Sequence, residues 1–244
     1  MSSYRTLIKL GKSLNTRHLG GFKAKGDKIT KDFVFLRGDM PYEMEDEDKQ
    51  QAYDLGIRTV VDLRSVNENE MFPNSLANYE GIKYYSIPIP SDSHDMFVNK
   101  KYTHMGNVYE HYLNSNKEEL TKIFNIFLSE GSGILFHCFI GKDRTGTVAA
   151  MLLLLAGVDE EDIINDYAIS STLLMPAFNL LYTEMMKILG NDEKLVEMVL
   201  GSQREHMEYF ISVLNKNYGG VENYLKTVGF ADSNIEMLRN KLFE

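Results

Sequence analysis

Cysteine is almost absent from this 244-residue chain, and tryptophan is absent altogether. The single cysteine, Cys138, rules out an intramolecular disulfide framework and any zinc site built on several cysteines. The six histidines show no HExxH or comparable metal-binding spacing. We therefore expect neither a metal nor a cofactor. The remaining question is what function the single cysteine has.

Long apolar runs and excess positive charge are also missing. The longest apolar run, AAMLLLLAGV at 149–158, is too short to span a bilayer, and the N-terminal stretch has no continuous apolar core typical of a secretory signal. The formal net charge of -9 argues against nonspecific attraction to nucleic acid or to anionic membranes. We expect no nucleic-acid partner, no stable membrane insertion and a cytoplasmic location; export would require a signal peptide that has been removed.

The remaining pattern alternates between strands and helices. β-branched or apolar runs predict strands at 32–38, 58–65, 81–90 and 132–138. Helical spacing is expected at 43–57, twice within 102–129, at 144–158 and throughout the chain from 159 onward. The sequence predicts one α/β domain, 1–244, with a small, mostly parallel central sheet flanked by helices and a helical C-terminal half. Residues about 159–216 are a candidate cap for its active site.

Cys138 lies in the stretch HCFIGKDRTG, 137–146, between a strand and a nearly all-apolar helix. Ligands of open parallel sheets bind at the carboxyl ends of the strands, and a helix N-terminus there favours anions. Backbone amides of the loop can therefore point at one bound anion. The residues expected to bind phosphate in this way are Phe139, Ile140, Gly141, Lys142, Asp143 and Arg144.

The same surroundings suit a nucleophile. Nearby cations and a helix N-terminus favour the thiolate form of a cysteine, so we expect Cys138 to be a thiolate at neutral pH. Arg144, six residues later in a C-x5-R spacing, can present two donors to a tetrahedral anion, and Thr145 can donate a hydrogen bond to the sulfur. This chemistry is phosphoryl transfer through a phosphocysteine, with amides and Arg144 neutralising the transition state without a metal.

This loop resembles the HCxxGKDRTG form of the bacterial tyrosine phosphatase family that includes the LipA-like enzymes. Further stretches are similar to that family in the same order: LNTRHLGGF (14–22), VFLRGDM (34–40), VVDLRSVNENE (60–70), NYGGVENYLKTVGF (217–230) and MLRNKLF (237–243). The resemblance implies a protein tyrosine phosphatase-like fold. It also implies phosphomonoesterase activity on phosphotyrosine, and in several members on phosphoserine, phosphothreonine and phosphoinositides.

Several residues near the loop are expected to support it. His137 is predicted to order the loop by hydrogen bonding rather than to act in catalysis. Arg64, at the carboxyl end of a strand, is predicted to line the pocket; for Asp62, pocket lining and a surface ion pair are equally open. Lys142 is predicted to be a second cation at the pocket floor or rim.

The general acid has two candidate positions. Cysteine phosphatases usually protonate the leaving oxygen with an aspartate on an upstream loop, where this chain offers Asp92 and Asp95. A Trp-Pro-Asp loop is excluded because there is no tryptophan. In similar enzymes the loop aspartate, here Asp143, is a candidate for the same role, and we favour Asp143 over Asp92.

Other functional classes remain to be distinguished. A Walker-type nucleotide loop is excluded because Asp143 stands where a serine or threonine should bind magnesium. A phosphate-binding module with weak or no catalysis would need neither Cys138 nor the acid, and a rhodanese-like sulfur transferase would not need the GKDRTG continuation. Turnover of an aryl phosphate and of thiosulfate would distinguish the three.

Overall fold

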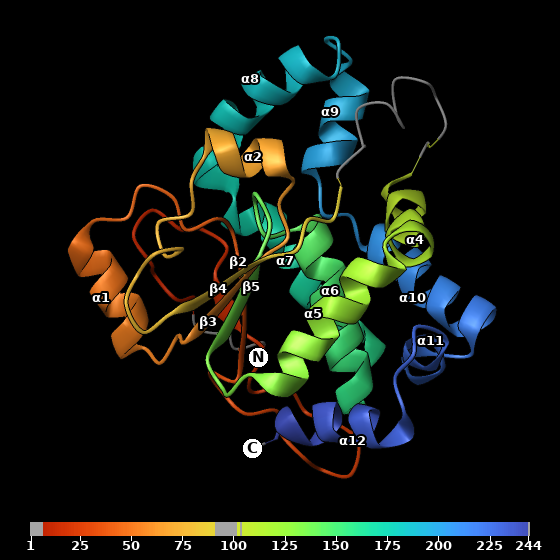
Figure 1. Ribbon diagram of the computed structural model, residues 1–244. Coiled ribbons are helices and arrows are strands. Elements are labelled where there is room, and N and C mark those ends of the chain that lie inside the picture. Colours follow the sequence, from red (N-terminus) through yellow and green to blue (C-terminus); the bar gives the residue numbers. More distant parts are fainter. Residues whose placement is uncertain (1–6, 91–101, 103, 244) are drawn as a thin grey trace.

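A computed structural model of the protein describes residues 7–90, 102 and 104–243, and its centre is a five-stranded sheet of order β1-β2-β5-β3-β4 (Figure 1). The strands are β1 (Arg17–His18), β2 (Phe35–Gly38), β3 (Thr59–Asp62), β4 (Lys83–Ser86) and β5 (Ile134–His137). Strands β2, β5, β3 and β4 are parallel neighbours, and only β1 runs antiparallel, against β2. The predicted small, mostly parallel sheet is confirmed.

The sheet is buried on both faces. In β5 all four side chains are buried, and its three apolar residues alternate between two apolar clusters. Leu135 packs on the side of α1 (Asp46–Asp54), whereas Ile134 and Phe136 pack on the side of α5 (Lys117–Ser129) and α6 (Asp143–Ala156). Because neighbouring residues of a strand point to opposite faces, a strand covered on both faces is mostly apolar along its length, and in β5 only the last residue, His137, is polar.

Helices cover the two faces unequally. Helix α1 lies on one face, and most of the helical mass lies on the other (Figure 1). The remaining helices are α2 (Val66–Met71), α4 (Met105–Ser115), α7 (Glu160–Leu173), the 3-10 turn η1 (Met175–Ala177), α8 (Phe178–Ile188), α9 (Glu193–Leu200), α10 (Arg204–Tyr218), α11 (Val221–Thr227) and α12 (Asp232–Lys241). The predicted helical C-terminal half is confirmed. No helix of the described residues is long and apolar enough to cross a bilayer.

Several predicted element boundaries need correction. The strand expected at 32–38 covers only Phe35–Gly38, and the strand expected at 132–138 covers only Ile134–His137. The helix expected at 43–57 covers only Asp46–Asp54: the backbone N–H of Glu45 donates to Asp48 at its start, and a left-handed Gly56 follows its end. The strand expected at 58–65 stops at Asp62, and α2 begins four residues later at a Ser65 cap. The strand expected at 81–90 is confined to Lys83–Ser86.

Helix α6 positions the loop that precedes it. Twelve of its fourteen residues are buried, and it ends at Gly157, whose positive φ of 79° suits the left-handed conformation of a helix C-cap. A helix so fully buried cannot shift without opening the core. The loop between β5 and α6 is therefore held at both ends by rigid elements.

Candidate active site

Cys138 directly follows β5 and is 2% exposed, at the base of the loop that leads into α6. Gly141 forms the turn of this loop with a φ of +69°. A Cβ at that position would lie 2.4 Å from the carbonyl oxygen of Gly38 in β2. The loop thus packs closely against the end of the neighbouring strand, and only glycine fits at the contact.

The carbonyl groups of the loop are tied to surrounding residues. The four pairs are His137 Nδ1 to Cys138 O (2.9 Å), Met40 N to Phe139 O (3.0 Å), Asn15 Nδ2 to Ile140 O (2.8 Å) and Arg37 Nη2 to Gly141 O (2.8 Å). Because C=O and N–H of a trans peptide point in opposite directions, the N–H groups of residues 139–142 face away from these anchors. Within the described part of the chain, no acceptor takes the N–H groups of residues 139–144, which is the arrangement an anion site needs.

A buried ion network supports two of these anchors. Arg17 Nη1 donates to Asn15 Oδ1 at 2.7 Å, and both Arg17 Nε and Arg37 Nη1 bind the carboxylate of Asp166 in α7, at 2.9 and 2.6 Å. Burial alone would raise the pKa of Asp166, but Arg17 and Arg37 outweigh it and hold that pKa well below its usual range. The stretches that resemble the family at 14–22 and 34–40 carry the two arginines and Asn15, whereas no sequence signal pointed to Asp166.

Arg144 is clamped by Glu68. The two guanidinium nitrogens Nη1 and Nη2 each lie 2.7 Å from a carboxylate oxygen of Glu68, which also accepts a hydrogen bond from Ser65 N at 2.7 Å. Burial acts to lower the pKa of Arg144, but Glu68 and Cys138 outweigh it and raise that pKa. Glu68 was missed as a site residue, although it lies within the stretch VVDLRSVNENE (60–70) that resembles the family. The first turn of α2 thus fixes the arginine's direction.

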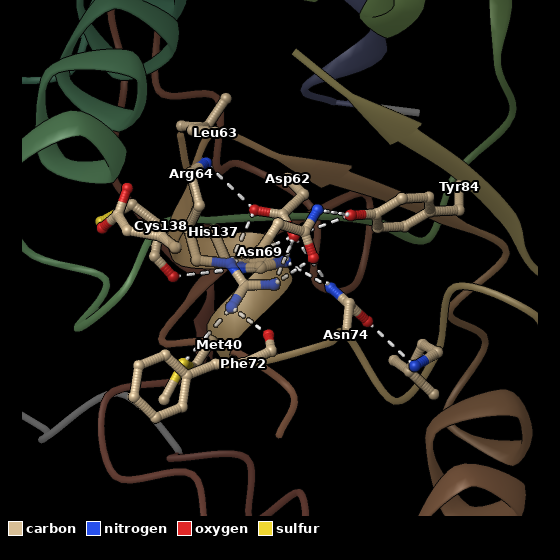
Figure 2. A network of polar contacts seen from close by, with 12 residues as sticks. Met40, Asp62, Leu63, Arg64, Asn69, Phe72, Asn74, Tyr84, His137 and Cys138 are labelled. Carbon is tan, nitrogen blue, oxygen red and sulfur yellow. Dashed lines mark hydrogen bonds and ion pairs between the residues drawn. The ribbon is translucent and has the colours of Figure 1, made fainter. Parts of the chain in front are cut away.

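Asp62 and Arg64 form a buried ion pair (Figure 2). Both side chains are fully buried, and Arg64 Nη2 lies 2.7 Å from Asp62 Oδ2 while its Nη1 donates to Phe72 O at 2.7 Å. The prediction that Arg64 lines the pocket is wrong, because its guanidinium is used inside the protein. For Asp62, neither alternative holds: it is a buried partner of Arg64 and of the Tyr84 hydroxyl at 2.9 Å.

His137 lies against this pair, and its tautomer follows from its neighbours (Figure 2). Asn74 Oδ1 accepts from Leu76 N, so its amide nitrogen faces His137 Nε2 at 2.8 Å and donates to it. The ring proton therefore sits on Nδ1, which donates to the carbonyl of Cys138. Burial lowers the pKa of His137, which keeps the ring neutral. These contacts support the loop-ordering role predicted for His137.

Lys142 does not lie at the pocket floor or rim. Its side chain is fully buried, and Nζ donates to the carbonyls of Val199 and Gly201, at 2.5 Å each, where α9 ends. The expectation of a second cation available to substrate is wrong, because carbonyls at a helix C-terminus attract the ammonium group away from the loop centre. The backbone N–H of Lys142 remains one of the loop N–H groups that have no acceptor among the described residues.

Asp143 opens α6 and its side chain is 17% exposed. Its Oδ1 accepts a hydrogen bond of 2.5 Å from the hydroxyl of Tyr109 in α4 and lies 3.3 Å from Lys142 Nζ. The other acid candidates, Asp92 and Asp95, lie outside the described residues. The hydrogen bond expected from Thr145 to the sulfur is not formed: within the described chain its buried Oγ1 has no partner.

The fold and the loop define a class of protein. In this class a cysteine follows a central parallel strand, the next loop presents free backbone N–H groups, and an arginine stands six residues after the cysteine. Residues 8–244 match the model described as the tyrosine phosphatase family. The chain belongs to the tyrosine phosphatase family, as the HCFIGKDRTG stretch predicted.

Two curated proteins and one solved structure are similar to this chain. The chain is 29% identical over 206 residues, 81% of this chain and 70% of the relative, to a tyrosine-protein phosphatase of Nostoc commune. It is 29% identical over 126 residues, 47% of this chain and 45% of the relative, to the triple specificity protein phosphatase PtpB of Mycobacterium tuberculosis. The core catalytic domain of the PP-IP phosphatase SIW14 from S. cerevisiae shows 16% identity over 90% of this chain and 98% of that one, with a TM-score of 0.41. The family and the sequence relatives support phosphatase activity for this chain.

Proposed function

We propose that the protein is a metal-independent phosphomonoester hydrolase that works through a phosphocysteine on Cys138. The observation that carries the proposal is the loop after Cys138: the carbonyls of residues 138–141 bind surrounding residues, and the N–H groups of residues 139–144 have no acceptor among the described residues. Such donors are already oriented before the charge of the transition state develops, which is where their stabilisation counts.

The reaction has two steps. In the first, the Cys138 thiolate attacks phosphorus, the S–P bond forms, the ester P–O bond breaks, and the carboxyl group of Asp143 gives its proton to the leaving oxygen. In the second, water attacks phosphorus, Asp143 takes the water's proton, and the S–P bond breaks to return the thiolate and release inorganic phosphate. Arg144, directed by Glu68, binds the equatorial oxygens in both steps.

Phosphotyrosine proteins are the substrates we propose first, because the family and its named relatives are tyrosine phosphatases. The name of the Mycobacterium tuberculosis relative, a triple specificity phosphatase, supports extending the proposal to phosphoserine and phosphothreonine. Phosphoinositides stay within the proposal as alternative substrates. Because the Lys142 ammonium binds two carbonyls at the end of α9, the additional phosphates of a phosphoinositide would need other cations.

The organisation of the chain also belongs to the proposal. We treat residues 1–244 as one phosphatase domain in which the segment of about 159–216 caps the active site. A cavity of about 130 Å³ between Ile140 of the loop, Leu174 and Phe178 supports this, because the cap meets the catalytic loop there. A cytoplasmic location is supported by the single cysteine, since a thiol nucleophile stays reduced in that compartment.

Hydrolysis of an aryl phosphate in the presence of a chelator tests the proposal. We expect full turnover with the chelator, inhibition by vanadate, and loss of turnover in Cys138→Ser with folding retained. Activity that requires an added metal, or more than trace activity in Cys138→Ser, would refute the mechanism. Turnover of thiosulfate in place of the aryl phosphate would indicate the rhodanese alternative.

A further inference from the structure

Two buried tyrosines from different helices meet at Asp143. Tyr109 of α4 and Tyr167 of α7 are at most 1% exposed. The Tyr109 hydroxyl lies 2.5 Å from Asp143 Oδ1 and 2.6 Å from the Tyr167 hydroxyl. Packing alone does not require two hydroxyl groups here, because phenylalanine would fill the same space.

The direction of these hydrogen bonds can be assigned. A phenol has one proton, and Tyr109 must use it toward the carboxylate, which only accepts. The proton between the two tyrosines therefore comes from Tyr167, so the chain runs from Tyr167 to Tyr109 to Asp143. Burial raises the pKa of both tyrosines well above the ordinary value of a tyrosine. Both hydroxyls therefore stay protonated, and the direction of the two hydrogen bonds is fixed.

The two oxygens of Asp143 are used differently. Oδ1 receives the Tyr109 hydroxyl and faces Lys142 Nζ at 3.3 Å, whereas Oδ2 has no hydrogen bond to any described residue. Since the side chain is 17% exposed, one oxygen is anchored inside the protein while the carboxyl group still reaches solvent. Anchoring one oxygen fixes the plane of the carboxyl group and so the direction in which the other oxygen points.

We propose that Tyr109, oriented by Tyr167, is a positioning residue for the general acid: it holds Oδ1 of Asp143 so that Oδ2 delivers the proton to the leaving oxygen. This inference rests on the proposed function and on Asp143 as its acid. The hydroxyl also donates to the carboxylate that forms as the proton leaves, which favours that transfer.

The other groups around Asp143 do not compete for this role. They are Lys142 from the loop, Tyr112 from α4 and His206 from α10. The ammonium of Lys142 is already bound by two carbonyls of α9, and burial lowers the pKa of His206 to about 4, so that this ring is neutral at working pH. Tyr109 is the neighbour whose removal isolates the hydrogen bond to Oδ1.

The test is Tyr109→Phe, compared on phenyl phosphate and p-nitrophenyl phosphate across pH. Without the donor, the carboxylate that forms as the proton leaves loses a hydrogen bond, so the basic limb of the kcat profile should move to higher pH. kcat for phenyl phosphate, which has the more basic leaving group, should fall about tenfold, and that for p-nitrophenyl phosphate less than about threefold. Equal losses on both substrates with an unmoved limb would overturn the proposal, because that is the result of a merely structural role.

Three further variants keep the test decisive. Tyr224→Phe is the matched control, since this buried tyrosine also binds α4, through the Leu113 carbonyl at 2.8 Å, and should leave the profile unchanged. Tyr167→Phe should shift the basic limb in the same direction by a smaller amount. If Tyr109→Phe does not fold, Tyr167→Phe replaces it as the test variant. No shift in Tyr167→Phe would count against the proposal. In an Asp143→Asn background, Tyr109→Phe should add no leaving-group dependence.

Failure of the proposed function would look different. It would appear as no turnover of aryl phosphates by the wild-type protein. Failure of the acid assignment would appear as an Asp143→Asn variant without leaving-group dependence. With both intact, an unaltered Tyr109→Phe profile contradicts the tyrosine proposal alone.

Discussion

Arg144 and Glu68 show how a single residue pair directs the site. Arginine offers two parallel donors, and Glu68 takes one from each terminal nitrogen, so the plane of the guanidinium is set before any substrate arrives. Glu68 is itself fixed because its carboxylate accepts from Ser65 N and its backbone N–H donates to Ser65 Oγ at 3.3 Å. A motif that caps a helix therefore also orients the arginine that we propose binds phosphate.

Two substitutions distinguish the effect of the positive charge of Arg144 from the effect of the orientation of its guanidinium. Arg144→Lys keeps the charge but loses the paired donors, and kcat should fall by a factor on the order of a hundred or more. Glu68→Gln leaves Arg144 in place with a weaker partner, and kcat should fall about tenfold. Glu70→Gln, exposed on the same helix, is the control and should be unchanged. Steady-state kinetics decides, and near-normal kcat in Arg144→Lys would mean that the loop does not wrap around phosphate.

At the scale of elements, the sequence predicted the helices and strands that have a periodic apolar pattern. It missed the features that depend on a single contact with a distant residue. The apolar strand β5 and helix α6 follow from local pattern, and with them the loop between them. Helix α2 was missed because its six residues, VNENEM, bury no side chain and so carry no apolar period. The direction of Lys142 was wrong for a similar reason: its partners, the carbonyls at the end of α9, lie 57 and 59 residues further along the chain.

The contact of Lys142 with the end of α9 predicts how strongly this helix is held against the loop before α6. Lys142→Met removes the ammonium and leaves two carbonyls of the α9 end without their charged donor. Because such hydrogen bonds are worth about 1.5–3 kcal/mol, amide hydrogen exchange in α9 should accelerate by about tenfold to a hundredfold. Lys187→Met, an exposed lysine on α8 paired with Glu184, is the matched control and should not change it. Unchanged exchange in Lys142→Met would mean that α9 is held without this contact.

Across the whole molecule, the site depends on contacts between distant parts of the sequence. Asp166 binds Arg17 and Arg37, which are 149 and 129 residues away along the chain, and Arg37 in turn binds Gly141 O in the loop between β5 and α6. Family resemblance marked the two arginines, but nothing local in EEDIINDYAI distinguishes a buried carboxylate from a surface one. Sequence reasoning therefore found the residues of the loop and not the network behind it.

The Asp166 network makes stability depend on acid in a defined direction. The pKa of Asp166 is lowered by folding, so its contribution is complete above the unfolded pKa of about 4 and is lost as pH falls below that value. Asp166→Asn should cost about 3–5 kcal/mol of unfolding free energy at neutral pH, and this deficit relative to wild type should shrink as pH falls below about 4. Denaturant unfolding across pH measures it, with Glu47→Gln on exposed α1 as the control. A deficit that is constant with pH would contradict the ion network.

The most direct measurement is to trap the intermediate. The protein is mixed with a 32P-labelled aryl phosphate, quenched in acid during turnover, digested, and its peptides are analysed by mass spectrometry. The account predicts a single phosphoryl group on the sulfur of Cys138, in the peptide containing HCFIGKDRTG, and no label in Cys138→Ser. Steady turnover with no label on Cys138, or with the label on another residue, would contradict the phosphocysteine mechanism.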